Sequence, residues 1–586
     1  MDEKNKEKNT AERREERLMA YCFPAGQKRG RVALIGAVLM VLATLFCTGV
    51  VIYYIAGPME GELHSDFTDT IYWANASYES GRLFDPDFTY AGLLPFSANI
   101  WFLPLIALFG VTMKTQVIGM IVFCLLFVAS VYFLCRSFDW SLPWTCFSIC
   151  ALLMVFSFGK KLREILWGHV IYYSLALLLL FFGLGLLVRL QKIRWDEMAG
   201  AENRKKRWLG ALAALLSGVF FALVATDGLQ IVALSTLPAL VAIGAELFFD
   251  GKKKLFDRAN LPTWCMLVGV LVSTGVGYLI LQKMLGGITA PYADAYSSLA
   301  PISYWKEHAQ DLPRHYFSLM GEEVTNGLPL KEMKSLFHLL KMIVAVLLQV
   351  LPLILLCCYP KIRDRGTRLI LWAHLTVEAI TLFGYICGWL SSANWRMVPM
   401  VGTSVLASVA TLRFLLERRS ARPDTPYSAC RRMGSVLCAM LVCAMLFSAK
   451  QVLDFQADYG RQNDLHKLTE KLEAEGLKQG YATFWYSQAI TLLSDSKVKV
   501  AMIRTDNGKG VWSDFYQNSY KWYESHEDVD RYFVLLTTSE YISAIKNQEW
   551  SAYVKEQNPE RIDVDERYII LVFRENPDIL RFRTAS

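Results

Sequence analysis

The chain has 586 residues, of which 54% are hydrophobic and 20% are charged, with a formal net charge of +7. Its apolar residues gather in long segments, and because about 20 such residues cross ~30 Å of hydrocarbon, the composition excludes an ordinary soluble enzyme. The basic residues gather in an arm at 13–31 and in loops between apolar segments. That is positive-inside patterning, so we expect no nucleic-acid partner.

The apolar segments predict a polytopic α-helical membrane protein. We expect eleven spans, at 33–56, 115–135, 140–158, 165–189, 208–226, 228–248, 262–285, 336–358, 367–390, 396–417 and 433–449. A further apolar segment, 93–112, is interrupted by Pro95 and Pro104 and carries Asn99 in its middle. Counting it as a span would place the basic loop 189–207 outside the cell. We therefore expect this segment to lie at the membrane surface or to re-enter it.

The basic loops predict the orientation and the domains. They lie at 189–207, 250–258, 359–368 and 413–432, and we assign them to the cytoplasm. The predicted organisation is a cytoplasmic arm at 1–32, a transmembrane domain at 33–449 with exported loops at 57–112 and 286–335, and an exported domain at 450–586. None of the 13 cysteines falls in the exported parts, which therefore fold without disulfides. We expect a multi-pass protein of the plasma membrane with its N-terminus inside and its C-terminal domain outside.

The C-terminal part has the pattern of a small α/β domain. It opens with an amphipathic helix pattern, QNDLHKLTEKLEAEG, that ends at Gly476. Short runs rich in β-branched and aromatic residues follow, at 481–485, 498–503, 532–538 and 568–573. Such alternation of a helix with short apolar runs predicts helices packed on a sheet.

Several common catalytic motifs are missing from the chain. It contains no Walker-A run, no HExxH, no CxxC and no GxSxG, and no GxGxxG between a strand and a helix. The loops assigned to the cytoplasm are too short to hold a nucleotide-binding domain. An enzyme built this way works at the outer face of the membrane and takes activated groups from lipid carriers.

Two carboxylates follow the first span closely. Asp66 and Asp69 lie in the stretch HSDFTDTIYWANASYE, and on a helix their three-residue spacing puts them on one face. A carboxylate near both water and hydrocarbon can take a proton from an attacking hydroxyl. The alternative is that Ser65 or Asp66 caps a helix that begins near Phe67, with Asp69 at the positive end of its dipole.

The same region carries a resemblance to a known family. The first long span, the Asp pair, the stretch GRLFDPDFTYAGLLPF and the proline-interrupted helices that end in LFG resemble the GT-C membrane glycosyltransferases. The closest likeness is to bacterial relatives of the dolichyl-phosphate-mannose protein mannosyltransferases (family 39), and the tail phrase GYATFWYSQAITLLSDSKVKV is similar to their soluble domain. The resemblance implies transfer of a sugar, with inversion, from a polyprenyl-phosphate carrier to a glycan, lipid or protein acceptor.

The resemblance also suggests roles for the two acids. An acidic residue of the first exported loop acts as general base in these families, which implies Asp66 as the base. Asp69 would then be a second base, a substrate ligand or a metal ligand. A divalent cation, Mg²⁺ or Mn²⁺, remains open as a cofactor.

A leaving lipid phosphate needs cations near the outer surface. The candidates are Arg396 with its neighbour Asn394, and the cluster Lys160, Lys161 and Arg163. Trp and Arg also anchor span ends at the interface, which is the alternative for Arg396. The cluster opposes the positive-inside trend, so it is either functional or the sign of a helix threaded differently.

Two further residues are candidates for substrate contacts. His169 follows the cluster with Tyr172 at helical spacing and could line the same cleft, although a buried interface histidine is the simpler interpretation. Asp227 lies between two predicted spans on the outer side and could bind sugar hydroxyls. A turn residue beside Gly228 is the alternative for it.

The competing prediction is a transporter or a lipid flippase. It rests on His374 and Glu378, an ionisable pair inside a predicted span, with Lys341 as a candidate partner. The chain shows no repeated halves, and a transporter has little use for an exported α/β domain. A scaffold that presents the tail to cell-wall partners is the third alternative.

Overall fold

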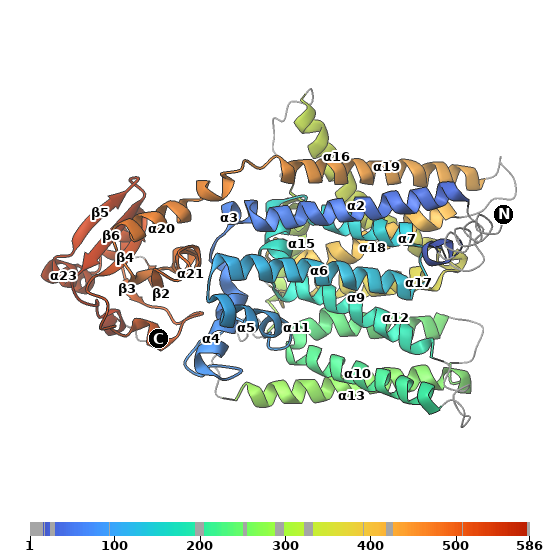
Figure 1. Ribbon diagram of the computed structural model, residues 1–586, viewed down its shortest axis with the longest axis horizontal. Helices are drawn as coiled ribbons and strands as arrows, with labels where there is room; N and C mark the ends of the chain where they lie inside the picture. Colours follow the sequence, from blue (N-terminus) through green and yellow to red (C-terminus); the bar gives the residue numbers. More distant parts are fainter. Residues whose placement is uncertain are drawn as a thin grey trace, which may run out of the picture.

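Long helices that run side by side make up most of the molecule, with a small β-sheet domain at one end (Figure 1). The computed structural model describes residues 16, 18–23, 30–92, 94–193, 204–249, 255–286, 298–321, 332–390, 392–417, 426–506 and 508–582. Most of the predicted arm 1–32 and parts of the loop 286–335 lie outside these residues.

Within the described residues, ten helices are long and apolar enough to cross a membrane, or eleven if a bent pair counts as one span. The helices of membrane length are α2 (Arg31–Ala56), α6 (Met113–Ser137), α9 (Tyr172–Gln191), α10 (Arg204–Thr226), α12 (Leu237–Phe249) with the short helical turns α11 (Leu229–Ile231) and η4 (Val232–Thr236) before it, α13 (Leu261–Met284), α16 (Met333–Cys357), α17 (Arg365–Ile386), α18 (Val398–Glu417) and α19 (Pro426–Leu453). The prediction of a polytopic helical membrane protein is confirmed.

The bent pair follows α6. Helix α7 (Leu142–Val155) is succeeded by two short helical turns, α8 (Lys160–Arg163) and η2 (Glu164–Gly168), which bend away from it by 117°. At the bend, a Cβ on Gly159 would lie 2.7 Å from the Cα of Gly321, so only glycine permits this approach.

The prediction of one continuous span at 165–189 is therefore wrong at its first residues. Residues 165–168 belong to the bent segment, and α9 begins only at Tyr172. The start of α9 is fixed locally, because the backbone N–H of Ile171 donates to Ser174 Oγ at 3.1 Å. The Lys160–Arg163 cluster lies on the bent segment.

Segment 93–112 forms only a short apolar helix, as expected. Helix α5 (Ser97–Phe109) has 13 residues with Pro104 inside it, which is too short to cross the membrane. It lies beside α4 (Asp69–Ser80) at the end of the bundle that carries the sheet domain (Figure 1). Two shorter pieces, α3 (Pro58–Glu62) and η1 (Ser65–Thr68), connect α2 to α4.

The two ends of the bundle differ in what covers them. The N-terminal end of α2 lies at the right of Figure 1 and the sheet domain at the left, so they occupy opposite ends of the bundle. Helix α15 (Ile302–Leu319), from the predicted loop 286–335, lies at the sheet-domain end, where His308 Nδ1 is 3.1 Å from the carbonyl oxygen of Ile386.

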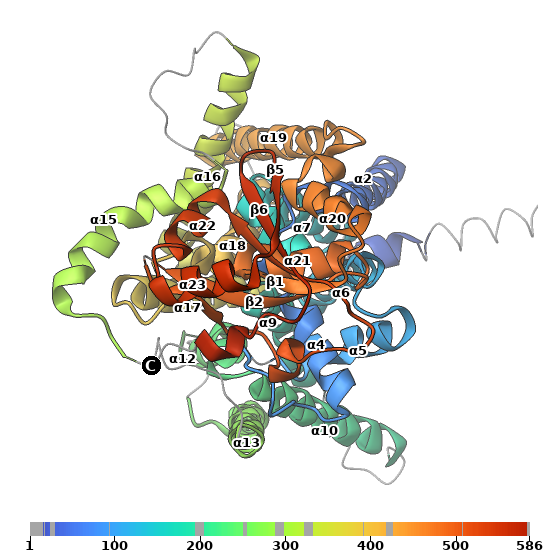
Figure 2. The ribbon, with the colours of Figure 1, turned by 90° about the vertical axis from the view of Figure 1, so that its left-hand side faces the viewer.

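The C-terminal part contains a six-stranded sheet in the order β3-β2-β1-β4-β6-β5. Strands β1 (Gln479–Thr483), β2 (Lys499–Asp506) and β4 (Tyr532–Thr537) are parallel, whereas β3 (Gly510–Ser513), β5 (Glu560–Val564) and β6 (Tyr568–Phe573) pair antiparallel with their neighbours. Helix α21 (Phe484–Leu493) connects β1 to β2, and α20 (Asp464–Ala474), α22 (Thr538–Ala544) and α23 (Gln548–Gln557) complete the domain. Seen from its own side, the domain covers the middle of the bundle end (Figure 2).

The prediction of a small α/β domain in the C-terminal part is correct, and the end of one predicted strand needs a correction. The four predicted runs correspond to β1, β2, β4 and β6, but residues 484–485 begin α21 instead of continuing a strand. Thr483 is the residue before this helix, and its backbone is still extended (φ −68°, ψ 164°). Strands β3 and β5 had no prediction, because each is short and carries no apolar run.

Candidate functional site

The acidic turn after the first span exposes one carboxylate and buries the other. The side chain of Asp66, on η1, is 36% exposed, and that of Asp69, at the start of α4, is buried. The residues that precede these two helices are His64 and Thr68, and neither start has a side-chain cap hydrogen bond. The alternative that Ser65 or Asp66 caps a helix here is therefore wrong, whereas Asp69 does lie in the first turn of α4, as the same alternative predicted.

Asp69 lies under the sheet domain. Burial raises the pKa of its carboxyl group well above the ordinary value, the nearby charge of Asp66 raises it further, and a hydrogen bond from Gln517 opposes both effects. Gln517 Nε2 donates to Asp69 Oδ1 at 2.8 Å. Asp69 is thus closed to an incoming hydroxyl, whereas Asp66 is open to one.

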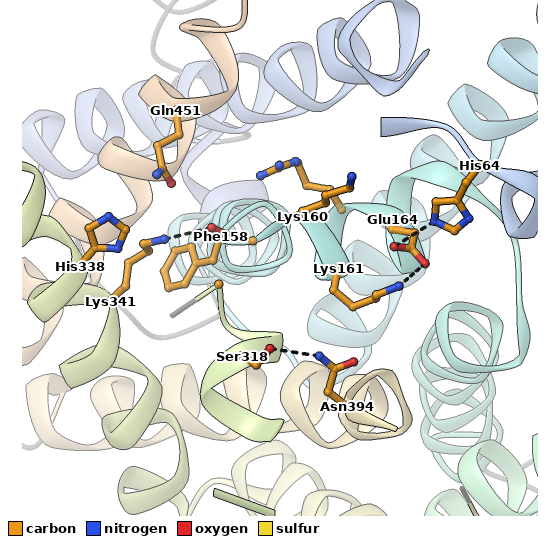
Figure 3. A pocket seen from close by; sticks show the side chains of 13 residues that line it. His64, Phe158, Lys160, Lys161, Glu164, Ser318, His338, Lys341, Asn394 and Gln451 are labelled. Carbon is orange, nitrogen blue, oxygen red and sulfur yellow. Dashed lines mark hydrogen bonds and ion pairs between the residues drawn. The ribbon is translucent and has the colours of Figure 1, made fainter. Parts of the chain in front are cut away.

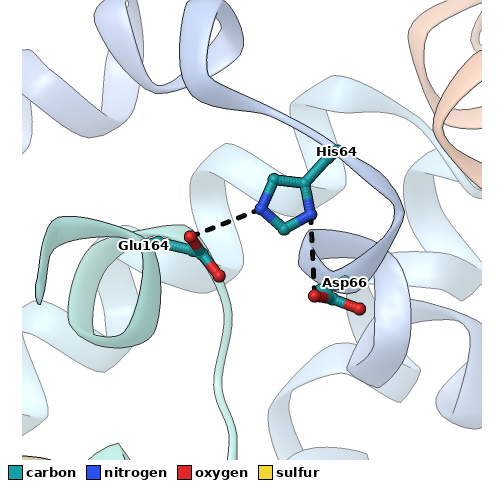
Figure 4. Close-up of side chains that lie close together, drawn as sticks. All are labelled: His64, Asp66 and Glu164. Atoms are coloured by element: carbon teal, nitrogen blue, oxygen red, sulfur yellow. Dashed lines mark ion pairs between the residues drawn. The ribbon is translucent and has the colours of Figure 1, made fainter. Parts of the chain in front are cut away.

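His64 connects Asp66 to a second acid from a distant part of the chain. Its Nδ1 lies 3.7 Å from Asp66 Oδ2, and its Nε2 lies 3.4 Å from Glu164 Oε2 (Figure 4). The other oxygen of Glu164 accepts a hydrogen bond from Lys161 Nζ at 2.6 Å. One ligand atom from each of His64, Asp66 and Glu164 lies within 4.8 Å of the others, a grouping that could hold a metal ion.

Gln116 of α6 explains why these distant segments meet. Its Nε2 donates to the carbonyl oxygens of Phe67 at 2.9 Å and Gly168 at 2.7 Å, which joins η1 to η2. The two turns also touch directly, because a Cβ on Gly168 would lie 2.2 Å from the ring of Phe67. Asp66 and Glu164 are carried by these two turns.

A cavity of about 610 Å³ opens beside the cluster (Figure 3). It lies where the bent segment, α15, α16, the end of α19 and the short turn η7 (Asn394–Met397) before α18 meet. Its lining residues are His64, Phe158, Gly159, Lys160, Lys161, Arg163, Glu164, Ser318, Gly321, His338, Lys341, Asn394 and Gln451.

The lining of this cavity carries more positive than negative charge. Lys160, Lys161 and Lys341 line it, and among its described lining residues Glu164 is the only carboxylate. Lys341 is buried and donates to the carbonyl oxygen of Phe158 at 3.1 Å. The three predicted cations Lys160, Lys161 and Arg163 therefore do line one cavity, and Lys341 from α16 lines it with them.

Arg163 also lines the cavity, but its charge is balanced within the protein. Its Nη2 lies 2.5 Å from Glu62 Oε1 and its Nε lies 3.1 Å from Glu62 Oε2. The hydroxyl of Tyr54 donates to the same carboxylate at 2.6 Å. This buried ion pair fastens the bent segment to α2 and α3.

Asn394 and Arg396 take different positions. Asn394 lines the cavity, and its Nδ2 donates to Ser318 Oγ at 3.4 Å. Arg396 is buried outside the described lining, with its guanidinium 5.3 Å from the ring centroid of Tyr173 on α9. Of the two, Asn394 is the better placed for a ligand in the cavity.

His169 lies next to the acidic cluster and Asp227 does not. The ring of His169 is buried and stacks on Phe67 at a centroid distance of 5.7 Å, and its electrostatic neighbours include Glu164 and Asp66. Asp227 is fully buried and accepts a hydrogen bond from the backbone N–H of Phe96 at 2.9 Å, immediately before α5. Its described contact is structural and lies outside the lining of the cavity.

The pair on which the transporter alternative rests is present in α17. His374 Nε2 lies 3.5 Å from Glu378 Oε2, and His374 Nδ1 lies 3.1 Å from Thr403 Oγ1 on α18. Lys341, suggested as their partner, instead lines the cavity with Lys160.

Sequence reasoning missed several residues of this site. His64 and Glu164 lie beside residues that were predicted, and the adjacent motif HSD and the acid of KKLRE were signals that could have found them. His338 gave no signal, because a single histidine at the start of a span is usually structural. Gln517 comes from the tail, 448 positions after Asp69, and no local pattern indicates it.

Comparisons with known proteins give only a distant likeness. No family model matches the chain, and no curated protein matches it. Among solved structures it is similar to the oligosaccharyltransferase of Archaeoglobus fulgidus in its apo form, with 11% identity over 90% of this chain and 73% of that chain and a TM-score of 0.44. The archaeal oligosaccharyltransferase AglB from Archaeoglobus fulgidus, in complex with an inhibitory peptide and a dolichol-phosphate, matches with 11% identity over 93% of this chain and 77% of that chain, with a TM-score of 0.43. These values assign no role to any residue of this chain.

Proposed function

We propose that this protein is a membrane glycosyltransferase of the GT-C type that transfers a sugar from a polyprenyl-phosphate carrier to an acceptor. The observation that carries the proposal is the exposed carboxylate of Asp66, one side chain away from a cavity with an excess of positive charge. A transferase of this kind needs a base for the acceptor hydroxyl and cations for the leaving phosphate, and both lie at the sheet-domain end of the bundle.

Asp66 is the general base in this proposal. Its carboxylate accepts the proton of the acceptor hydroxyl while the hydroxyl oxygen bonds to the anomeric carbon. The bond from that carbon to the phosphate oxygen breaks, and the phosphate leaves with the electron pair. A single displacement inverts the anomeric carbon. Asp69, which is buried and bonded to Gln517, does not meet the acceptor.

The lysines of the cavity receive the phosphate. Lys160 and Lys341 come from two different segments and can balance its charge through charge-assisted hydrogen bonds. Asn394 adds an uncharged donor at the same wall. The cavity lies among α16, α18 and α19, so the lipid chain of a carrier can remain in the bilayer beside them.

A divalent cation fits the group formed by His64, Asp66 and Glu164. Their atoms are close enough to share one ion, and Lys161 occupies only one of the two oxygens of Glu164. An imidazole with two carboxylates suits Mn²⁺ better than Mg²⁺. Such an ion would supply positive charge beside the phosphate. Binding of Mn²⁺ alone to the purified protein, followed by electron paramagnetic resonance, should be lost in His64→Ala if these residues form the site.

The proposed location is the plasma membrane, with the N-terminus in the cytoplasm and the sheet domain outside. The domain boundaries that we propose are 33–449 and 450–586. Support comes from the basic loops, since the ends that they join lie opposite the sheet domain. A periplasmic or extracellular reporter fused after Ser586 should be active, and activity of only a cytoplasmic reporter would overturn this orientation.

The experiment that tests the proposed function uses the purified full-length protein. It is incubated with undecaprenyl phosphate linked to mannose, glucose, galactose or arabinose, with crude cell-envelope glycans, lipids and proteins as acceptors. We expect release of undecaprenyl phosphate from at least one donor and appearance of the sugar on one acceptor class. Binding of the donors without any release would contradict the proposal and favour a transporter or a scaffold.

A further inference from the structure

We infer that two buried glutamines of the sheet domain, Gln488 and Gln517, position the acidic turn, so that this domain is part of the catalytic site. The inference rests on the proposed function, because it assigns these residues to the placement of Asp66. Both are positioning residues, since neither lies where a substrate could touch it. Both side chains are fully buried.

Every polar group of Gln517 has a partner, and three of the four partners lie outside the sheet domain. Its Nε2 donates to Asp69 Oδ1 at 2.8 Å, and its Oε1 accepts from Trp73 Nε1 at 2.9 Å. Its backbone N–H donates to the carbonyl oxygen of Thr89 at 2.8 Å, and its own carbonyl accepts from Gln488 Nε2 at 2.5 Å.

The orientation of the Gln517 amide is fixed by chemistry. The indole N–H of Trp73 can only donate, so the amide oxygen must face it and the NH₂ group must face Asp69. This assignment holds whether Asp69 is ionised or protonated, because its Oδ1 accepts in both forms.

The backbone of Gln517 is held in a conformation that a free loop would avoid. Its φ of +55° lies in the left-handed region, which residues other than glycine adopt rarely and at a cost. Two isolated bridges flank it, between Phe88 and Ser519 and between Thr89 and Tyr516. Contacts from both the sheet domain and the predicted exported loop therefore keep Gln517 in this conformation, and they offset the strain of its backbone.

Gln488 acts on the turn that carries Asp66. Its Oε1 lies 3.0 Å from Thr68 Oγ1, at the last residue of η1, and shares the single proton of that hydroxyl with the carbonyl oxygen of Ser65 at 2.6 Å. Its carbonyl oxygen accepts from the hydroxyl of Tyr72 at 3.3 Å. Gln488 thus contacts both η1 and α4, and Gln517 contacts the adjacent residues Asp69 and Trp73 of α4.

A base must be held close to its productive position, because a displacement of about 1 Å can cost a hundredfold in rate. η1 has only one turn, and its start lacks a side-chain cap. The two glutamines add polar contacts from the sheet domain to those that the turn receives from Thr68 itself and from Gln116. Loss of either should therefore slow the reaction without weakening donor binding, since neither glutamine is among the described residues that line the cavity.

The test compares Gln517→Leu and Gln488→Leu in the full-length protein with Gln548→Leu, a matched change at an exposed glutamine of the same domain. Turnover is measured with the undecaprenyl-phosphate sugar that the wild type accepts, and affinity with fluorescent undecaprenyl phosphate. Hydrogen exchange is followed for residues 65–73 and for strands β1 and β4. We expect kcat to fall at least about tenfold in both variants, with affinity within about twofold of the wild type. Exchange should be faster at 65–73 and unchanged in the two strands.

A reciprocal exchange keeps the inference testable if the leucine variants fold poorly. Gln517→Glu alone removes the NH₂ donor and brings two carboxyl groups together at Asp69, and it should be as slow as Gln517→Leu at a pH high enough that the two groups do not share a proton. Combining it with Asp69→Asn restores a donor and an acceptor in the opposite order, and should recover much of kcat and of the protection at 65–73. Recovery of this kind would not follow from a general loss of stability.

The outcomes separate the inference from the function on which it rests. If the leucine variants retain normal kcat and normal exchange at 65–73, the two glutamines do not position the turn, and the inference is overturned. If exchange at 65–73 rises as expected but Asp66→Asn keeps full turnover, the contact exists and the proposed base is wrong.

Discussion

The two ends of the helix bundle use their charged residues differently. At the end opposite the sheet domain, cations pair with carboxylates of neighbouring helices: Arg365 Nε lies 2.7 Å from Glu246, and Arg413 Nη1 lies 2.9 Å from Asp364. At the sheet-domain end, Lys160 and Lys341 surround a cavity in which the described lining offers a single carboxylate. At the first end these charges join neighbouring helices, whereas at the second end Lys160 and Lys341 line a cavity beside the paired cations Lys161 and Arg163.

The ion pairs at the two ends of the bundle also differ in how deeply they are buried. Arg163 and Glu62 form a buried ion pair at the sheet-domain end, with 9% and 3% of their side chains exposed. Lys192 and Asp139 form a pair at the opposite end with 35% and 69% exposed. Water screens the exposed Lys192–Asp139 pair but not the buried Arg163–Glu62 pair. Breaking the buried pair should therefore lower the free energy of unfolding much more than breaking the exposed one.

The largest effect is expected from Glu62→Ala. It leaves the buried guanidinium of Arg163 without its carboxylate, and breaking a buried pair in this way costs about 3–5 kcal/mol. Unfolding in detergent, followed by intrinsic fluorescence against denaturant, measures the change. Stability within about 1 kcal/mol of the wild type would show that Arg163 finds another partner, and would return it to the candidates for phosphate binding.

A smaller effect is expected from Lys160→Ala, this time on binding. Removing one exposed cation from the cavity should weaken the binding of fluorescent undecaprenyl phosphate about tenfold, or by about 1.4 kcal/mol. The matched control is Lys192→Ala at the opposite end, which should leave affinity unchanged. Equal losses in both variants would mean that the lipid phosphate responds to overall charge and not to this cavity.

The smallest effect is expected from Asp139→Asn, because Asn tolerates the left-handed backbone at this position (φ +58°) and only the charge is removed. The exposed pair with Lys192 should contribute less than about 1 kcal/mol to the free energy of unfolding. The same denaturant experiment measures it beside Glu62→Ala. A loss as large as that of Glu62→Ala would remove the contrast between the two ends.

Much of the fold could be predicted because membrane spans are encoded locally. Each long apolar run carries its own signal, and Pro104 marked α5 as an exception. The bend at Gly159 was missed, because it depends on the approach of Gly321 from another segment. Strands β3 and β5 were missed for a similar reason, since their neighbours in the sheet stabilise them and their own sequences do not.

The site was predicted in part for the same reason. Asp66 could be named from its position after the first span, and Lys160 from its departure from the positive-inside trend. The contacts of Asp66 with Glu164, through His64, depend on the meeting of two turns from distant parts of the chain. Gln517 depends on the docking of an entire domain. No local pattern reports such contacts.

Asp66→Asn tests the central claim most directly. The change keeps the shape of the side chain and removes its charge and its basicity. Turnover of the undecaprenyl-phosphate sugar and affinity for fluorescent undecaprenyl phosphate are measured together, with Asp87→Asn, an exposed acid of the same loop that pairs with Lys521 at 3.2 Å, as the matched control. The account predicts a loss of turnover of at least about a hundredfold in Asp66→Asn, with donor affinity retained and the control unchanged. Normal turnover in Asp66→Asn would contradict it.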